Sequence, residues 1–209
     1  MQVSLCVNDK KEIDIIYMQT GAMKALFERY PEVLLIDGTH CVNNRRMPLY
    51  SLMVMDNNGR GRIVRYALVN SETVAIITKV MEMFKAANPK SSDLRAVLLD
   101  KDCSEIACMQ HVFPGAHIVI CKFHVLKTFR SAVARLVQGG EAKEKVPKIL
   151  ETLVCGNDFE MHPTPVWLPI KNMWATNLYK DVGCSGNETI DRLEHHNAVI
   201  KQVVTCKSL

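Results

Sequence analysis

Apolar residues recur along the chain in two kinds of spacing, which predict strands and helices. Four apolar residues before Asp37 predict a buried strand over 33–37, and the apolar run before Asp100 predicts another over 95–99. Alternating or β-branched segments predict three more strands, over 48–55, 63–69 and 117–121. Apolar positions at helical spacing predict helices over about 21–30, 72–87, 103–112, 122–138, 141–154, 170–180 and 187–204.

The connections between these segments predict how the strands pair. Asn58-Gly59 favours a hairpin between strands 48–55 and 63–69, because tight turns need positive φ angles. Ser71 is the predicted N-cap of the crossover helix that follows, which returns strand 95–99 parallel to strand 33–37. We therefore expect an α/β fold with a mixed five-stranded sheet and flanking helices. Segment 13–17 is a further strand candidate.

Composition narrows the class of protein only slightly. A chain of 209 residues suits one α/β domain with an appendage, and its net charge of +4 permits a nucleic-acid partner without indicating one. The eight cysteines include no Cys-x-x-Cys pair, and the N-terminus lacks the architecture of a signal peptide. We therefore expect an intracellular protein with free thiols. No apolar run is long enough to predict a membrane span.

Asp37 and Asp100 both stand where a predicted parallel strand ends, so the fold should bring the two carboxylates together. Paired carboxylates are the ligands that Mg²⁺ or Mn²⁺ requires in sites for phosphoryl transfer. Two structural interpretations remain open. Asp37-Gly38 is also a common turn pair, and Asp100 competes with Asp102 to cap the following helix.

Cys121 and His124 have the short spacing of half a zinc site, which needs two more ligands. The remaining candidates have no diagnostic spacing: His162, His195, His196, Cys155 and Cys184. A buried thiol and a histidine at a helix start are the structural alternative.

Basic residues in two turn regions and on a helix are candidates for contacts with nucleic-acid phosphates. They are Arg45, Arg46, Arg60, Arg62, Lys127 and Arg130. Basic residues in turns and on outer helix faces are also commonly just solvated, so this assignment needs the structure.

Seven short segments, taken in order, resemble the transposase domain of Mutator-like elements (the MULE family) between about Gln19 and Lys201. The segments are 34–39, 47–50, 68–73, 99–102, 113–116, 121–125 and 187–194. The residues at 19–24 and 40–44 are most similar to vertebrate SWIM-type zinc-finger proteins, which descend from such transposases. The chain departs from those relatives because it contains neither their SWIM motif nor the N-terminal DNA-binding zinc module of active elements.

The resemblance implies a ribonuclease-H-like core over 32–138 and 187–205, preceded by a segment with a short helix over 1–31. Residues 139–186 would form a helical insertion. It also implies that Asp37, Asp100 and Glu194 are the Asp-Asp-Glu (DDE) triad that holds Mg²⁺ or Mn²⁺. Cys121 and His124 would be the Cys-x-x-His element of the family, a candidate Zn²⁺ site.

Two functions follow from the resemblance. The first is a domesticated module, in the nucleus or alternatively the cytoplasm, that binds DNA or protein without transposition. The second is an active two-metal transferase or nuclease that cleaves and joins DNA strands. The three acids favour catalysis, whereas the missing flanking modules and the harm of unrestrained strand transfer to a host favour the first function.

Overall fold

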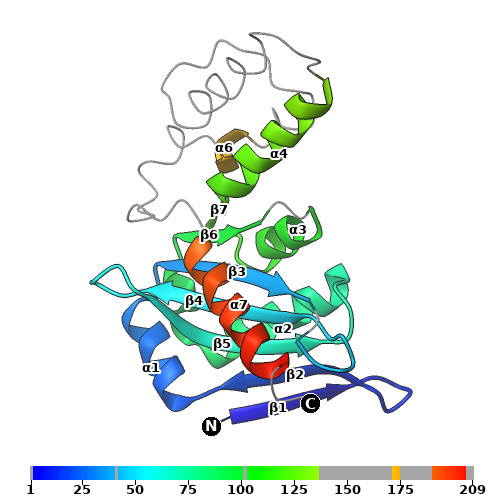
Figure 1. The fold of residues 1–209 in the computed structure, drawn as a ribbon. Coiled ribbons are helices and arrows are strands. Elements are labelled where there is room, and N and C mark those ends of the chain that lie inside the picture. Colours follow the sequence, from blue (N-terminus) through cyan, green and yellow to red (C-terminus); the bar gives the residue numbers. More distant parts are fainter. Residues whose placement is uncertain (1, 41, 101–102, 137–170, 175–189, 206–209) are drawn as a thin grey trace.

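The computed structural model describes residues 2–40, 42–100, 103–136, 171–174 and 190–205. Within them, seven strands form one mixed sheet in the order β1-β2-β5-β4-β3-β6-β7 (Figure 1). The strands are β1 Gln2–Val7, β2 Ile13–Gln19, β3 Val33–Thr39, β4 Leu49–Met55, β5 Gly61–Val69, β6 Ala96–Leu99 and β7 His117–Ile120. The five predicted strands are present, the further strand candidate at 13–17 is β2, and β1 extends the sheet to seven.

The pairing of β3 with β6 is parallel, as the crossover helix predicts. Leu35 of β3 pairs with Leu98 of β6, and β7 adds a third parallel strand. On its other side β3 pairs antiparallel with β4, and β4 with β5. The parallel strands β3, β6 and β7 therefore end at one edge of the sheet, which is where the candidate acids stand.

Helices cover both faces of the sheet. They are α1 Gly21–Arg29, α2 Val74–Ala87, α3 Cys103–Val112, α4 Lys122–Leu136, α6 Lys171–Trp174 and α7 Asp191–Thr205, with a 3₁₀ turn at Pro89–Asp93. Buried residues of α1, α2 and α3 share the larger core with one face of the sheet. Helix α7 lies across the other face (Figure 1), where Ile190 and Leu193 join the smaller core beside Leu35 and Leu98.

Two local predictions need correction. The N-cap of α2 is Thr73 rather than Ser71, because the Thr73 side chain accepts the backbone N–H of Ile76. In the β4–β5 hairpin, Gly59 has a positive φ (68°) and Asn58 does not. The Asp56 side chain closes this loop by accepting backbone N–H groups, so the loop is longer than a two-residue turn.

Several predictions fall outside the described residues, including helix 141–154 and most of the insertion over 139–186. Among the described residues, Cys6, Cys108 and Cys121 have free thiols. No helix within the described ranges is long and apolar enough to cross a membrane.

Candidate functional site

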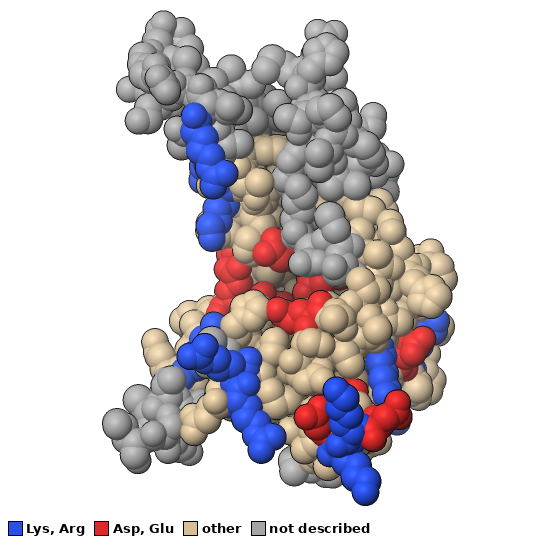
Figure 2. Space-filling model, turned by 90° about the vertical axis from the view of Figure 1, so that its right-hand side faces the viewer, with Lys and Arg blue, Asp and Glu red and all other residues tan. Residues whose placement is uncertain are grey.

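The parallel strands bring the first two candidate acids to the same cavity. Asp37 lies near the end of β3, and Asp100 follows directly after β6. Both line a cavity of about 160 Å³ at this edge of the sheet, together with Glu72 and Glu105, which sequence reasoning did not single out. Seen from the side toward which β3 runs, Figure 2 shows acidic side chains in a hollow with basic side chains above and below it.

His124 of α4 stands between the second and third acids. Its Nε2 atom lies 3.0 Å from Oε1 of Glu194, and its Nδ1 atom lies 3.5 Å from Oδ1 of Asp100. The Nδ1 contact has an ion-pair distance but lacks hydrogen-bond geometry. The His124 side chain is only 15% exposed, whereas that of Asp100 is 47% exposed. The structure thus gathers Asp100 and Glu194 around one imidazole.

Asp37 is held by a residue that sequence reasoning missed. The side-chain amide of Asn197, on α7, donates a hydrogen bond of 2.6 Å to Oδ2 of Asp37. The Ser51 hydroxyl on β4 donates to Oδ1 of the same Asn197 at 2.7 Å, which fixes the direction of the amide. Asn197 and Ser51 are both buried.

The sheet register explains why α7 can make these contacts. Asp37, Ser51 and Tyr66 are cross-strand neighbours on β3, β4 and β5, so they form a row beneath α7. Asn197 contacts the first two members of this row, and His196 lies 2.5 Å from the Tyr66 hydroxyl through its Nε2 atom. Because residues three apart share a helix face, Asn197 and Glu194 reach the acidic site from the same side of α7.

Asp37 has a perturbed acidity. Its pKa is raised from the usual 3.8 to about 6, chiefly because burial disfavours the charged form. The hydrogen bond from Asn197 and the charge of His124 oppose this rise, whereas the negative charges of Glu194 and Asp100 add to it. The carboxylate of Asp37 is therefore in an environment that favours either a proton or a nearby cation.

Cys121 has an environment quite different from that of His124. Its side chain is fully buried in the smaller core. Its sulfur accepts the backbone N–H of Ile190 at 3.5 Å and also faces backbone N–H groups in the first turn of α4. Burial raises the pKa of this thiol despite these hydrogen bonds. Cys121 thus joins the start of α4, which carries His124, to the start of α7, which carries Glu194.

Replacing Cys121 with Ala should loosen the start of α7. The change removes the sulfur that accepts the Ile190 N–H and leaves a small void, so we expect a loss of about 1–2 kcal/mol of unfolding free energy. Amide hydrogen exchange at Ile190 should become faster. Cys108→Ala is the matched control, because Cys108 is a buried thiol in the larger core. Equal exchange at Ile190 in the two variants would contradict this role.

The prediction of a zinc site at Cys121 and His124 gains no support from the described part of the chain. Within it, no group of three or more His, Cys, Asp or Glu side chains has an arrangement that could hold a metal ion. Of the further ligand candidates, Cys155, His162 and Cys184 lie outside the described residues.

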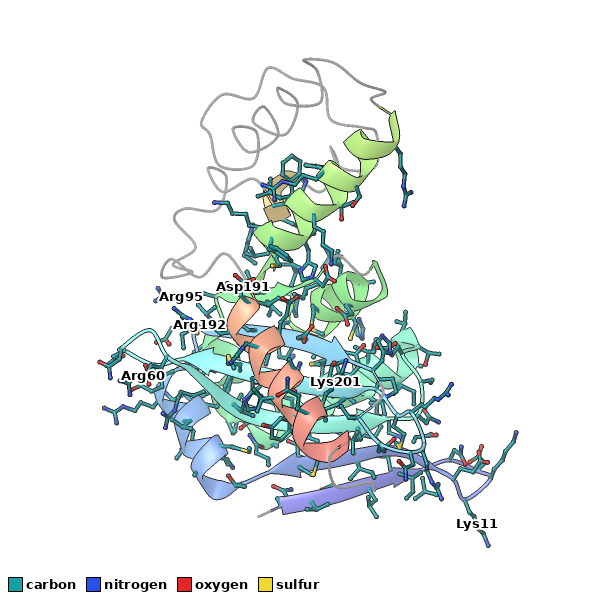
Figure 3. The ribbon with its side chains drawn as sticks, in the orientation of Figure 1. Lys11, Arg60, Arg95, Asp191, Arg192 and Lys201 are labelled. Carbon is teal, nitrogen blue, oxygen red and sulfur yellow. The ribbon has the colours of Figure 1, made fainter. Side chains whose placement is uncertain are left out.

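The six basic candidates are all exposed, and the structure places them in three separate regions. Arg45 and Arg46 lie in the loop between β3 and β4, and Lys127 and Arg130 lie on α4. Arg60 and Arg62 belong to the β4–β5 hairpin. Arg60 also lines a groove of about 550 Å³ between this hairpin and α7. Figure 3 shows Arg60, Arg95 and Arg192 on the same side of the molecule, far from Lys11.

The sheet order, the parallel β3–β6–β7 unit and the acids at its edge define a ribonuclease-H-like (RNase H-like) α/β domain. The family model described as "Zinc finger SWIM domain-containing protein 1/3, RNaseH-like domain" matches residues 1–119, more than half of the chain. The chain belongs to this family and is a transposase-derived RNase H-like domain. The match ends before α4 and α7, so it does not include His124, Glu194 or Asn197.

Individual proteins are similar to parts of the chain at low sequence identity. The chain is 27% identical over 101 residues (48% of its length) to FAR1-RELATED SEQUENCE 5 of Arabidopsis thaliana. It is 21% identical over 140 residues (66%) to the uncharacterized protein ZSWIM9 of Mus musculus. It is also 30% identical over 100 residues (47%) to the PKS-NRPS hybrid synthetase cheA of Chaetomium globosum. The chain spans only 13%, 31% and 2% of these proteins, respectively.

Among solved structures, the chain is similar to the HTLV-2 integrase catalytic core domain in complex with magnesium (dimeric form). The match covers 62% of this chain and 88% of that chain, with 10% sequence identity and a TM-score of 0.27. This TM-score is low, so the fold assignment rests on the family match and on the strand order described above.

Proposed function

We propose that the chain is a domesticated core of MULE-type descent that binds DNA in the nucleus without carrying out transposition. The observation that carries this proposal is the gathering of Asp100 and Glu194 around His124, beside an exposed basic face of α4. A DNA backbone is strongly negative, so carboxylates at its binding site need a neighbouring cation. The exposed side chains of Lys127 and Arg130 on α4 supply positive charge beside the two acids, which His124 contacts through both of its ring nitrogens.

The three candidate acids are suitable ligands for divalent metal ions, but their arrangement in the structure does not suit a two-metal site. Three carboxylates are suitable ligands for Mg²⁺ or Mn²⁺. In the structure, however, the imidazole of His124 stands between Asp100 and Glu194 and contacts a carboxylate oxygen of each. The described side chains therefore do not form a two-metal centre as they stand, and we derive no catalytic step through metal ions.

A second candidate function, a DDE transferase or nuclease, is favoured by one specific observation. Asp37 has a raised pKa and a position beside the other two acids, which is the electrostatic situation that a bound cation would relieve. The two functions differ in whether the acids act on the DNA backbone. Only the transferase or nuclease should cleave DNA strands, and its activity should require a divalent metal ion.

The basic face of α4 should determine the affinity for DNA. The double variant Lys127→Gln/Arg130→Gln should weaken binding to a 30-base-pair duplex. The negative slope of log K against log salt should become shallower by about 2, since two phosphate contacts are lost. Fluorescence anisotropy at several salt concentrations measures both quantities. Lys90→Gln is a control, because Lys90 lies in the 3₁₀ turn before β6 and pairs with Asp93. The proposal fails if wild type does not bind DNA, or if Lys90→Gln has the same effect.

Wild-type protein should not nick supercoiled DNA in the presence of Mn²⁺ or Mg²⁺, and agarose gel analysis of plasmid topology measures this directly. Asp100→Asn provides the comparison, because it removes one acid that touches His124. Nicking by wild type that Asp100→Asn abolishes would establish the second function instead. A metal-induced rise in melting temperature that Asp100→Asn lacks would point the same way, because a ligand that binds only the folded state stabilises it.

A further inference from the structure

Phe123, in the first turn of α4, is an aromatic side chain left in water beside the acidic site. It is 43% exposed. Among the exposed large hydrophobic side chains of the described residues, it is the only aromatic one. The others are Val3, Leu5, Val7, Ile13, Val74 and Val199. Leaving a phenyl ring partly hydrated forgoes part of the stabilisation that burial would give, and it keeps part of the ring accessible to a ligand.

Two neighbours fix the position of this ring. The ring of His124 packs against it edge to face, with centroids 5.5 Å apart and an interplanar angle of 82°. His124 in turn contacts Glu194 and Asp100. The ammonium nitrogen of Lys127, one helical turn further along, lies 5.9 Å from the centroid of the Phe123 ring. The exposed ring is thus held between the group that contacts the acids and an exposed cation.

We propose that Phe123 and Lys127 form a binding site for an unpaired nucleotide of a DNA strand at the edge of the acidic site. The base stacks on the exposed part of the Phe123 ring, and the adjoining phosphate pairs with Lys127. This inference rests on the DNA-binding function proposed above, and it specifies the class of DNA that the site takes.

The geometry favours an unpaired nucleotide over intact duplex. A base inside a duplex has both faces covered by its neighbours, so only a base at an end, in a single strand or turned out of the helix can stack on a side chain. A protein partner fits less well, because binding hot spots lie within surrounding apolar contacts that exclude water. Phe123 instead lies among charged groups, with Lys127 and the exposed Arg130 on its own helix.

The test compares three fluorescein-labelled DNA molecules that contain the same duplex: a blunt one, one with a four-nucleotide 3′ overhang, and one whose overhang carries four abasic sites. The abasic overhang keeps the phosphates and removes the bases. The 209-residue wild-type chain should bind the overhang with bases about tenfold more tightly than the abasic overhang, the size expected for stacking on an aromatic side chain. Anisotropy titration at low salt measures the affinities.

Three variants assign the preference to the ring. Phe123→Leu keeps an apolar side chain without an aromatic face, so the affinities for the two overhangs should become nearly equal. Phe123→Trp should retain the preference. Val199→Ala removes an exposed apolar side chain on α7 and should leave the preference unchanged. Because Phe123 is exposed, these variants should keep the wild-type melting temperature, which is measured alongside.

The outcomes separate this inference from the function on which it rests. If wild type binds none of the three DNA molecules, both proposals are overturned. If wild type binds all of them but has the same affinity for the two overhangs, only the stacking site is overturned. The same holds if Phe123→Leu keeps the preference for bases, or if Val199→Ala abolishes it as well.

Discussion

Asp37→Asn should stabilise the metal-free protein by about 1–3 kcal/mol at pH 8, and by little at pH 4.5. In the folded state the pKa of Asp37 is about 6 rather than 3.8, mainly because of burial. Between pH 4 and 6 the folded state therefore binds protons that the unfolded state has released. Stability falls as pH rises through this window and stays low above it. The substituted asparagine side chain carries no charge and still offers an acceptor to the Asn197 amide.

Urea unfolding of wild type and variant at pH 4.5, 6 and 8 measures this prediction. Asp56→Asn is a control that should change the stability in the opposite direction. The pKa of Asp56 is lowered because its carboxylate accepts the backbone N–H groups of Arg60 and Asn58 in the hairpin loop. Its replacement should weaken the protein at pH 8. If Asp37→Asn destabilises the protein at pH 8, the interpretation that the folded state disfavours the charged form of Asp37 is wrong.

The positions of Asp37 and Asp100 follow from local sequence. Each stands where an apolar run ends, and the crossover helix makes the two strands parallel, so the sheet must bring them to one edge. His124 is different. Its spacing from Cys121 indicated a shared metal, whereas the fold turns the thiol into the core and the imidazole toward Asp100 and Glu194. Cys121 precedes the first residue of α4, so its side chain does not have to share a helix face with that of His124.

Asn197 and β1 are two features of the fold that the sequence alone did not predict. Asn197 gives no local signal beyond its spacing of three from Glu194, because its partners Asp37 and Ser51 lie more than 140 residues away. The strand β1 does have alternating apolar residues, but Val3, Leu5 and Val7 are exposed at the edge of the sheet. An edge strand contributes little to the core, so its pattern carries little information about the fold.

Asn197→Leu should lower the unfolding free energy by about 2–4 kcal/mol at pH 8, because it leaves a buried hydroxyl and a half-buried carboxylate without their partner. Ser51 loses an acceptor and Asp37 loses a donor. The hydrogen bond from Asn197 is the largest influence that holds the pKa of Asp37 down. Its removal should raise this pKa further, so the loss should be smaller at pH 4.5, where Asp37 is protonated in either protein.

A double-mutant cycle tests whether the amide of Asn197 acts through Asp37. If it does, Asn197→Leu should be less damaging in the Asp37→Asn background at pH 8, because no buried charge then lacks a donor. Ser51→Ala removes the hydrogen bond from the Ser51 hydroxyl to Asn197 and leaves the bond between Asn197 and Asp37 in place. It should lower the unfolding free energy by about 1 kcal/mol with little dependence on pH. Urea unfolding at pH 4.5 and 8 gives every arm of the cycle. If the two substitutions are additive and their effects do not change with pH, Asn197 merely packs α7 onto the sheet. If they are coupled at pH 8 alone, the fold uses one buried amide to keep a carboxylate ionised beneath α7.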